Sequence, residues 1–373
     1  VKQFENNLNE LLFITSKNNI PVIIGNLVSN IKDQKPFLSK KFETAFDANT
    51  FFNLAIKEEE NKNFHKADSF YRLAKDYDLL KFRAPEKINK VINSFSKKYF
   101  VQNINIDSLF KNYSPNGLIG NNLMTDHLHP TLEGYKLIGE LFYKELKKIF
   151  NTKKSFIPKK ESPVIDYSFT QLDSTIADFR IKVLKNSWPY KLEETNTKNA
   201  FSKIGLNTIV DTLAINVLKE NISWVDAHSK LADFYFINKN YKAYFREMEV
   251  IIDQLPKENI IYESVATKLI EVRKYDLAEK ILLKQNRQEE TFFSNKWLGN
   301  ISLQNKNYEM AVKYLENSLQ FRNNDAQVLY NLAGCYLMLN QIEKAKDKLI
   351  TCLKINPDYQ QAKLLLEEIK SFN

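Results

Sequence analysis

The pattern of apolar and polar positions divides the chain into a mixed N-terminal part and a helical C-terminal part. Apolar residues recur at helical spacing over residues 4–18, and a β-branched apolar run at 21–28 is typical of a buried parallel strand. Residues 101–107 alternate between apolar and polar positions and predict a second strand. A loop over 111–130 and a helix over 131–149 follow. This alternation of helices and strands predicts an α/β fold.

Two further helical elements lie between the predicted strands. Residues 48–78 predict a helical hairpin, which we interpret as an insertion, and Pro85 starts another helix because proline is favoured in a first turn. Two strands are too few for a doubly wound sheet, so we expect a segment upstream of Val1, or a partner chain, to complete it. The helix at 131–149 is expected to turn one apolar set inward: Leu132, Tyr135, Ile138, Leu141, Phe142, Leu146 and Ile149.

A repeat with a period of 34 residues begins near residue 225. Ala311 and Ala345 are 34 residues apart, as are Leu298 and Leu332. The chain resembles the tetratricopeptide repeat signature most closely at Asn331, Leu332, Ala333, Tyr336, Ala345, Leu349, Cys352 and Pro357. Weaker copies precede this one, the hairpin at 48–78 fits the same template, and residues 359–373 are expected to form a capping helix.

These patterns predict three regions. Residues 1–150 form the α/β domain with its N-terminal part missing, residues 151–222 form a linker and helical connector, and residues 223–373 form an all-α repeat solenoid. The first fifteen residues of the linker are charged and contain proline, whereas residues 170–220 look helical but carry no motif.

Composition excludes several classes of function. The net charge is +9, but lysines are interleaved with acidic and amide residues and form no compact basic face, so a nucleic-acid partner is not expected. No apolar run approaches the roughly 18 residues of a membrane span.

Cys335 and Cys352 fall on packing positions of the repeat and are expected to be buried thiols.

The candidate chemistry lies in the stretch Asp126-His127-Leu128-His129-Pro130. An acid three residues before a histidine can fix the imidazole in one tautomer and direct its far nitrogen at a nucleophile. We therefore take Asp126 and His129 as candidate catalytic residues, with His127 as a solvent-facing neighbour. The alternative is a structural His129 that caps the following helix.

This stretch resembles the Asp-x-x-His block of the SGNH/GDSL hydrolases, which precedes the last helix of their three-layer α/β/α domain. The resemblance covers approximately residues 1–150 and implies that His129 is the general base and Asp126 its orienting acid. The family's Gly-Asp-Ser nucleophile block and its oxyanion-hole blocks have no counterpart here, and we expect them upstream of Val1. Ile106-Asp107-Ser108 lacks the turn glycine, so Ser108 is a poor substitute, and Asn26 and Asn30 could only line a cleft.

A metal site is the other interpretation of this stretch. Asp126, His127 and His129 are so close in sequence that tetrahedral coordination of one metal ion by all three would be strained. No cluster of cysteines or histidines elsewhere in the sequence offers a fourth ligand. We therefore expect neither a metal nor a cofactor.

Two functional hypotheses follow. In the first, the chain is the C-terminal part of an SGNH-type serine esterase, whose substrate class by resemblance is an ester-bearing carbohydrate, fused to protein-binding repeats. In the second, the α/β domain is inactive and the repeats form a scaffold that binds a protein or peptide in their concave groove. The compartment stays open, with a bacterial periplasm or cell surface slightly favoured.

Overall fold

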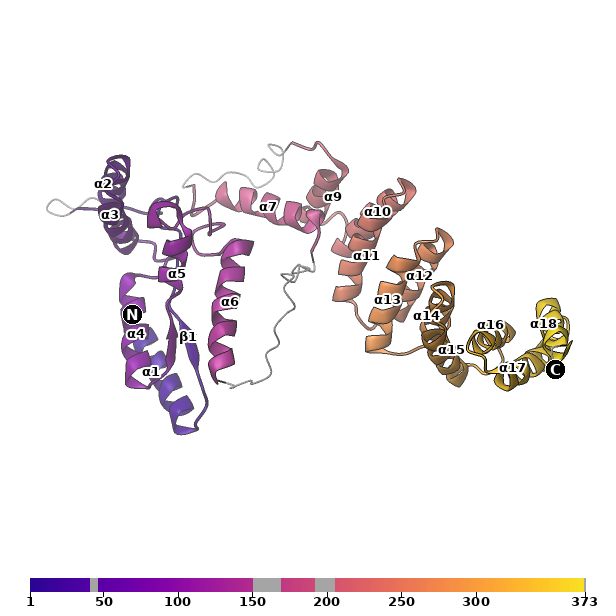
Figure 1. Cartoon of the computed structure of the whole chain (residues 1–373). Helices are drawn as coiled ribbons and strands as arrows, with labels where there is room; N and C mark the ends of the chain where they lie inside the picture. The colour runs from indigo at the N-terminus through magenta and orange to yellow at the C-terminus, as the bar shows by residue number, and fades with distance from the viewer. Residues whose placement is uncertain (41–45, 150–168, 192–204, 372–373) are drawn as a thin grey trace. The chain divides into compact units, whose positions relative to one another are not determined.

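A computed structural model describes residues 1–40, 46–149, 169–191 and 205–371, and the chain in it separates into two units (Figure 1). The N-terminal unit comprises Val1–Val164 with Leu184–Glu194, and the C-terminal unit comprises Ile165–Val183 with Thr195–Asn373. Each unit is described by itself. No helix among the described residues is long and apolar enough to cross a membrane.

The described sheet of the N-terminal unit has two strands. Strand β1 (Ile23–Gly25) pairs in parallel with β2 (Gln102–Ile104), in the register that places Ile24 opposite Asn103. Parallel neighbours need a crossover connection, which contains helices α2 (Ala48–Glu60), α3 (Phe64–Tyr77) and α4 (Glu86–Lys98). Both predicted strands are therefore confirmed, although each is shorter than expected.

Helices cover both faces of this sheet, because successive strand side chains point to opposite faces. Helix α1 (Lys2–Lys17) packs with α4 against one face, where Ile24 joins their apolar cluster. Helix α6 (Leu132–Ile149) lies on the other face, with Ile23 and Ile104. Figure 1 shows α1 and α4 on one side of β1 and α6 on the other. The described part of this unit thus has a small two-stranded sheet with helices on both of its faces, and most of the described chain is helical rather than α/β as predicted.

Helix α5 (Ile106–Tyr113) was missed by the sequence pattern, and the prediction that the second strand extends to residue 107 is wrong. The side chain of Asn105 accepts a hydrogen bond from the amide of Ser108 at 2.9 Å, which starts a helix immediately after β2. A short 3₁₀ turn, Pro115–Gly117, follows α5.

The prediction of which α6 residues point inward is correct only for the middle of the helix. Ile138, Leu141 and Phe142 pack against the core, whereas the predicted residues towards both ends are exposed: Leu132, Tyr135, Leu146 and Ile149. A three-residue strand is about 10 Å long, and an 18-residue helix is about 27 Å long. The described sheet therefore covers only the centre of α6.

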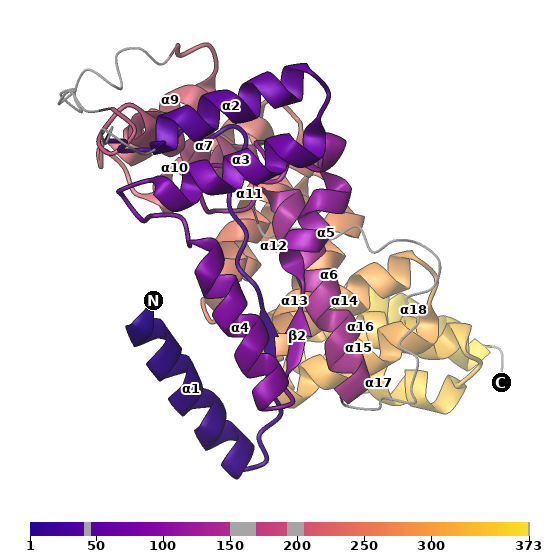
Figure 2. The same ribbon diagram turned by 90° about the vertical axis from the view of Figure 1, so that its left-hand side faces the viewer.

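The predicted hairpin at 48–78 is confirmed as α2 and α3, which Figure 2 shows side by side. Ala55, Ala67 and Ala74 are fully buried between the helices, which lets the two backbones approach closely. The rings of Phe52 and Tyr71 meet edge to face, with centroids 5.3 Å apart.

The C-terminal unit consists of helices in the described residues, beginning with the part of α7 (Gln171–Lys185) up to Val183 and α9 (Ile209–Leu218). Antiparallel helix pairs follow, and their cores stack from one pair to the next. Their helices are α10 (Trp224–Ile237), α11 (Tyr241–Gln254), α12 (Asn259–Glu271), α13 (Tyr275–Gln288), α14 (Phe292–Gln304), α15 (Tyr308–Phe321), α16 (Ala326–Met338), α17 (Ile342–Ile355) and the final α18 (Gln360–Ser371).

The same turn joins the two helices of every pair. Lys239, Arg273, Lys306 and Asn340 all adopt a left-handed backbone conformation with φ between 57° and 59°, at spacings of 34, 33 and 34 residues, close to the sequence period. The residue after each of them closes the turn, as in the bond from the amide of Gln341 to the carbonyl of Tyr336 at 2.8 Å. The earlier repeats, which match the repeat signature only weakly in sequence, therefore have the same turn geometry as the last repeats. Cys335 and Cys352 are buried free thiols, as predicted.

A buried polar network attaches α7 to the first helix pair. His228 of α10 is fully buried, with Nδ1 2.6 Å from Glu247 of α11 and Nε2 3.2 Å from Asp173 of α7. Trp224 donates from its indole nitrogen to the same Asp173 carboxylate at 2.7 Å. Burial opposes protonation of His228, but the two carboxylates outweigh it and raise the pKa of the imidazole above its ordinary value.

Candidate functional site

The loop that carries Asp126 and His129 is held in one conformation by backbone hydrogen bonds. The amide of Thr125 donates to the carbonyl of His129 at 2.8 Å, and the amide of Thr131 donates to the carbonyl of Leu123 at 2.8 Å. The second bond fixes the end of the loop at Thr131, the residue directly before α6.

Within this loop Asp126 organises the backbone and the imidazole together. One oxygen of its buried carboxylate accepts from the amides of Leu128 and His129, each at 2.8 Å, and the other lies 2.7 Å from Nδ1 of His129. Burial acts to raise the pKa of Asp126, but these hydrogen bonds outweigh it and hold the pKa below its usual range. The carboxylate is therefore ionised at neutral pH and orients the ring.

The His129 side chain is 58% exposed. When its Nδ1 carries the proton that faces Asp126, Nε2 is free to act as a base. Nε2 has no hydrogen-bond partner among the described residues, so no described serine is positioned as its nucleophile. The structure brings together the two residues predicted from sequence, as an acid–imidazole pair.

Ser108 is exposed in the first turn of α5, whereas Asn26 and Asn30, the two asparagines singled out by sequence, are buried and hydrogen-bonded within the fold. Asp107, beside Ser108, is held by Arg72 of α3 at 3.0 Å. The amide group of Asn26 bonds Asn105 at 2.9 Å, and that of Asn30 bonds Asn121 at 2.9 Å. These contacts brace the loops that follow the two strands.

The prediction that His127 faces solvent is wrong. Its ring packs edge to face on Phe37, with centroids 5.3 Å apart, and its Nδ1 lies 2.7 Å from the hydroxyl of Tyr190. Burial lowers the pKa of His127. The sequence carried no signal for this contact, because Tyr190 lies outside any motif and is 63 residues away.

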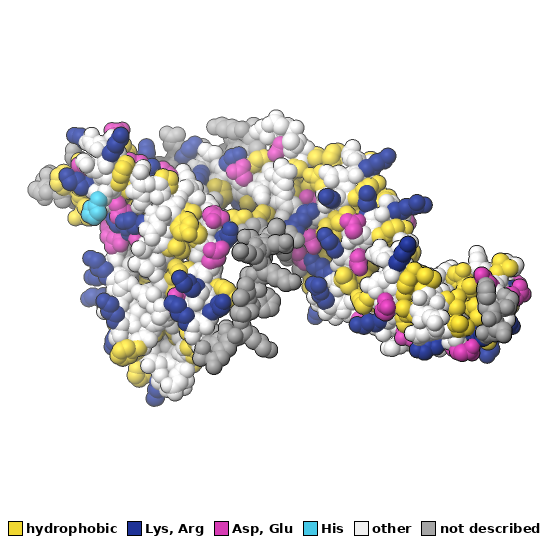
Figure 3. Space-filling view, viewed as in Figure 1, with side chains coloured by type: hydrophobic (Ala, Val, Ile, Leu, Met, Phe, Trp, Pro, Cys, Tyr) yellow, Lys and Arg dark blue, Asp and Glu magenta, His cyan; other side chains and the backbone are white. Residues whose placement is uncertain are grey.

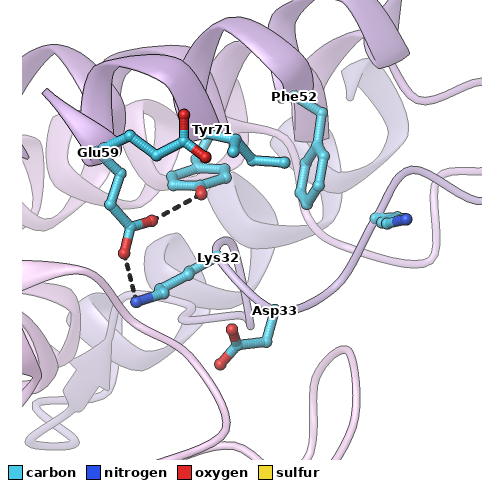
Figure 4. A pocket seen from close by; sticks show the side chains of 8 residues that line it. Lys32, Asp33, Phe52, Glu59 and Tyr71 are labelled. Atoms are coloured by element: carbon cyan, nitrogen blue, oxygen red, sulfur yellow. Dashed lines mark hydrogen bonds and ion pairs between the residues drawn. The ribbon is translucent and has the colours of Figure 1, made fainter.

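A cavity of about 590 Å³ opens between the loop after β1 and the α2–α3 hairpin (Figure 4). Lys32 forms an ion pair with Glu59 at 2.5 Å across it, and the hydroxyl of Tyr71 donates to Glu59 at 2.8 Å. The lining combines apolar and charged side chains: Phe52, Ile56, Tyr71, Lys32, Lys35, Asp33, Glu59 and Glu60. The loop that carries Lys32 is connected to the loop of Asp126 and His129, because the amide of Asn30 donates to the carbonyl of His127 at 3.1 Å.

In the C-terminal unit, polar and aromatic side chains of α14 and α16, together with Tyr359 directly before α18, form a connected row, in which Gln327 donates to Asn331 at 2.8 Å. Asn331 of α16 donates to Asn300 of α14 at 2.8 Å, and the rings of Tyr330 and Tyr359 lie 5.2 Å apart. The Tyr359 hydroxyl donates to Gln327 at 2.6 Å. We call Asn300, Gln327, Tyr330, Asn331 and Tyr359 the first-helix row. Its side chains supply amide and hydroxyl groups beside aromatic rings.

Comparisons with known proteins concern this C-terminal part. The family model described as tetratricopeptide repeat matches residues 302–369, and no curated protein sequence matches the chain. Among solved structures, the chain is similar to the MamA protein at 14% identity, with 40% of this chain and 87% of that chain covered and a TM-score of 0.34.

Two further solved structures show similarity of the same order. One is YrrB, described as a TPR protein with an unusual peptide-binding site, at 12% identity, 42% and 82% coverage and a TM-score of 0.35. The other is PilF of Pseudomonas aeruginosa, at 19% identity, 54% and 86% coverage and a TM-score of 0.33. These scores are low, so the assignment rests on the family model together with the repeated turns and the 34-residue period.

None of these findings supports the predicted SGNH/GDSL relationship. The matched family model, the sequence period and the stacked helix pairs agree on the other half of the prediction: the C-terminal part of this chain is an array of tetratricopeptide repeats.

Proposed function

We propose that this protein is an interaction scaffold that binds an extended peptide segment of a partner protein along the first-helix row. The single observation that carries the proposal is the connection between Asn300 and Asn331, which places two side-chain amides next to each other on successive first helices. Each amide has both donor and acceptor groups, so the pair can exchange its mutual bond for bonds to a peptide backbone.

The composition of the row indicates the kind of peptide that fits it. Its members are neutral, and the neighbouring Lys296 is neutralised by Asp325 at 2.8 Å. Tyr330 and Tyr359 offer ring faces for apolar or aromatic side chains. The favoured partner is therefore an extended segment with few charges and at least one bulky apolar residue.

Selection of peptides from a random phage-displayed library on the purified chain tests this proposal. Enriched peptides are then titrated against variants by fluorescence anisotropy. Asn331→Ala is expected to weaken binding by at least about fivefold, since one lost hydrogen bond is worth about 1 kcal/mol. The matched control is Gln320→Ala on α15, a second helix of a repeat. This variant also removes an exposed side-chain amide, and peptide binding is expected to stay unchanged. Equal loss in both variants, or no enriched peptide, contradicts the proposal.

A second candidate function rests on a separate observation, the bond of 2.7 Å between Asp126 and His129. Here the pair serves as the acid–base half of an SGNH-type serine esterase that hydrolyses an ester-bearing carbohydrate. Its serine and oxyanion-hole donors would come from outside the described residues or from a partner chain. His129 would take the serine proton and then protonate the leaving group.

Labelling with a fluorophosphonate probe separates the two candidates. The chain of 373 residues alone is expected to remain unlabelled. Protein purified from its source is expected to show a labelled serine if the second candidate is correct, and labelling must then fail in His129→Ala. An unlabelled source protein excludes the esterase and leaves the scaffold.

A further inference from the structure

An exposed apolar tip lies at the end of the N-terminal unit where both strands begin. Ile20, Phe100 and Ile149 line one depression there, although they follow or end three different helices, α1, α4 and α6. All three side chains are exposed to solvent. Figure 3 shows hydrophobic side chains and Lys or Arg side chains at this lower end of the unit, among white surface. We call these three residues the basal tip.

Phe100 is the most unusual residue of the basal tip. Its side chain is 97% exposed, which leaves a large aromatic ring in water. Its backbone is also left-handed, with φ 55°, a conformation that is sterically costly for a bulky side chain. The other non-glycine residues with positive φ among the described residues are all polar or charged. Neither packing nor backbone geometry therefore explains a phenylalanine at this position.

The backbone around Phe100 instead calls for glycine. The amide of Val101 donates to the carbonyl of Ser96 at 2.9 Å, which is the bond that closes a helix whose following residue is left-handed. At the equivalent place after α1 the chain has Asn19, which tolerates this conformation well.

Five lysines lie in the last turns of the three helices that end at the basal tip: Lys17, Lys97, Lys98, Lys147 and Lys148. Lys98 is directed back along α1, where it donates to Asn9 at 2.9 Å. Positive residues at helix C-termini are favourable for the helix itself, but these lysines have few acidic partners. Among the described residues, no acidic side chain lines the depressions around Phe100. Glu145 of α6 is paired with Lys148 at 2.7 Å.

We propose that the basal tip is a docking surface for an anionic lipid bilayer. Phe100 and Ile20 enter the boundary between headgroups and acyl chains, and the lysines lie at the level of the phosphates. A bilayer surface matches both features at once, because it offers apolar depth behind a negatively charged layer. A nucleic acid would match the lysines but not the exposed apolar side chains of Ile20 and Phe100. This inference is independent of the peptide-binding row, which lies in the other unit.

Sedimentation of the full chain with lipid vesicles tests the proposal. Binding is expected to vesicles of phosphatidylcholine with phosphatidylserine and not to vesicles of phosphatidylcholine alone. It is expected to weaken as salt is raised, because salt screens the lysines. Equal binding to both vesicles, or binding to duplex DNA without binding to vesicles, overturns the proposal.

Two variants separate docking from folding. Phe100→Gly removes the ring and the backbone strain together, so the melting temperature is expected to hold or rise while vesicle binding falls by at least about tenfold. Lys97→Glu is expected to weaken binding by at least about fivefold, the contribution of one lysine near an anionic surface. The matched control is Ile260→Asn on α12, which removes an isoleucine that is 75% exposed in the other unit. Retained binding in Phe100→Gly overturns the proposal, as does an equal loss in the control.

Discussion

At the scale of single residues, two helices of the repeat array approach each other closely at a glycine. A Cβ atom added to Gly299 of α14 would lie 2.6 Å from two side-chain carbons of Leu315 and 3.2 Å from the backbone nitrogen of the same residue. Gly334, in the next first helix, has no atom within 4 Å of the same position. The two glycines thus have different physical roles, although both lie in helix interiors.

The paired substitutions Gly299→Ala and Gly334→Ala test this difference. The first is expected to lower the free energy of unfolding by about 1–3 kcal/mol, because the added methyl group overpacks the helix pair. The second is expected to raise it by up to about 1 kcal/mol, because alanine favours a helix more than glycine does. Urea denaturation followed by circular dichroism measures both. Similar effects of the two variants would contradict the packing described around Leu315.

The acid–imidazole pair could be predicted from sequence because its two members are three residues apart on one loop. The same reasoning failed for His127, whose partners Phe37 and Tyr190 come from distant segments. It also could not identify Phe100, since its unusual feature is a backbone angle. Spacing along the sequence therefore predicts a contact between residues that are close in sequence. Contacts between distant segments can be identified only once the fold is known.

At the scale of elements, attachment of α7 depends on a protonated histidine. His228 can donate to Asp173 and Glu247 together only as an imidazolium, because a neutral ring carries a single N–H. Other groups that bear on the network are Tyr235, which faces Glu247, and Trp224, which donates to Asp173.

The pH dependence follows from the raised pKa of His228. Because the pKa is higher in the folded state than the ordinary value of about 6.5, the stabilisation is fully present below about pH 6.5 and is lost as the pH rises through the folded value.

Comparison of the chain with His228→Gln tests this dependence. The stability advantage of the unmodified chain is expected to be largest near pH 6 and to shrink towards about pH 9. Thermal unfolding across this range measures it, and His65→Gln at an exposed position is the control. An advantage that grows with pH would show that the buried ring is neutral.

The prediction of helices from sequence succeeded where regularly spaced apolar residues extend over many positions. It failed where a helix is short and one capping residue marks its start. The helical hairpin at 48–78 and the repeat helices follow from many regularly spaced residues. Helix α5 is short and starts at the cap formed by Asn105, and its first residues alternate like a strand. The exposed ends of α6 could not be predicted, because they depend on the width of the sheet that it covers.

At the scale of the whole molecule, each unit has its own apolar cores, so each should fold by itself. A protein of residues 169–373 contains α7 and every repeat helix. It is expected to unfold in one cooperative transition, and the full chain is expected to show that transition and a second one. Differential scanning calorimetry measures both. A fragment without a transition would show that the repeats depend on the N-terminal unit.

The central claim is that the repeat array binds a peptide through the first helices of its repeats. Hydrogen exchange with mass spectrometry, on the full chain with and without a peptide selected as above, tests it most directly. We expect slower exchange on binding in α14 and α16, which carry Asn300 and Asn331, and little change in α15 and α17. Protection confined to α15 and α17, or to the N-terminal unit, would contradict it.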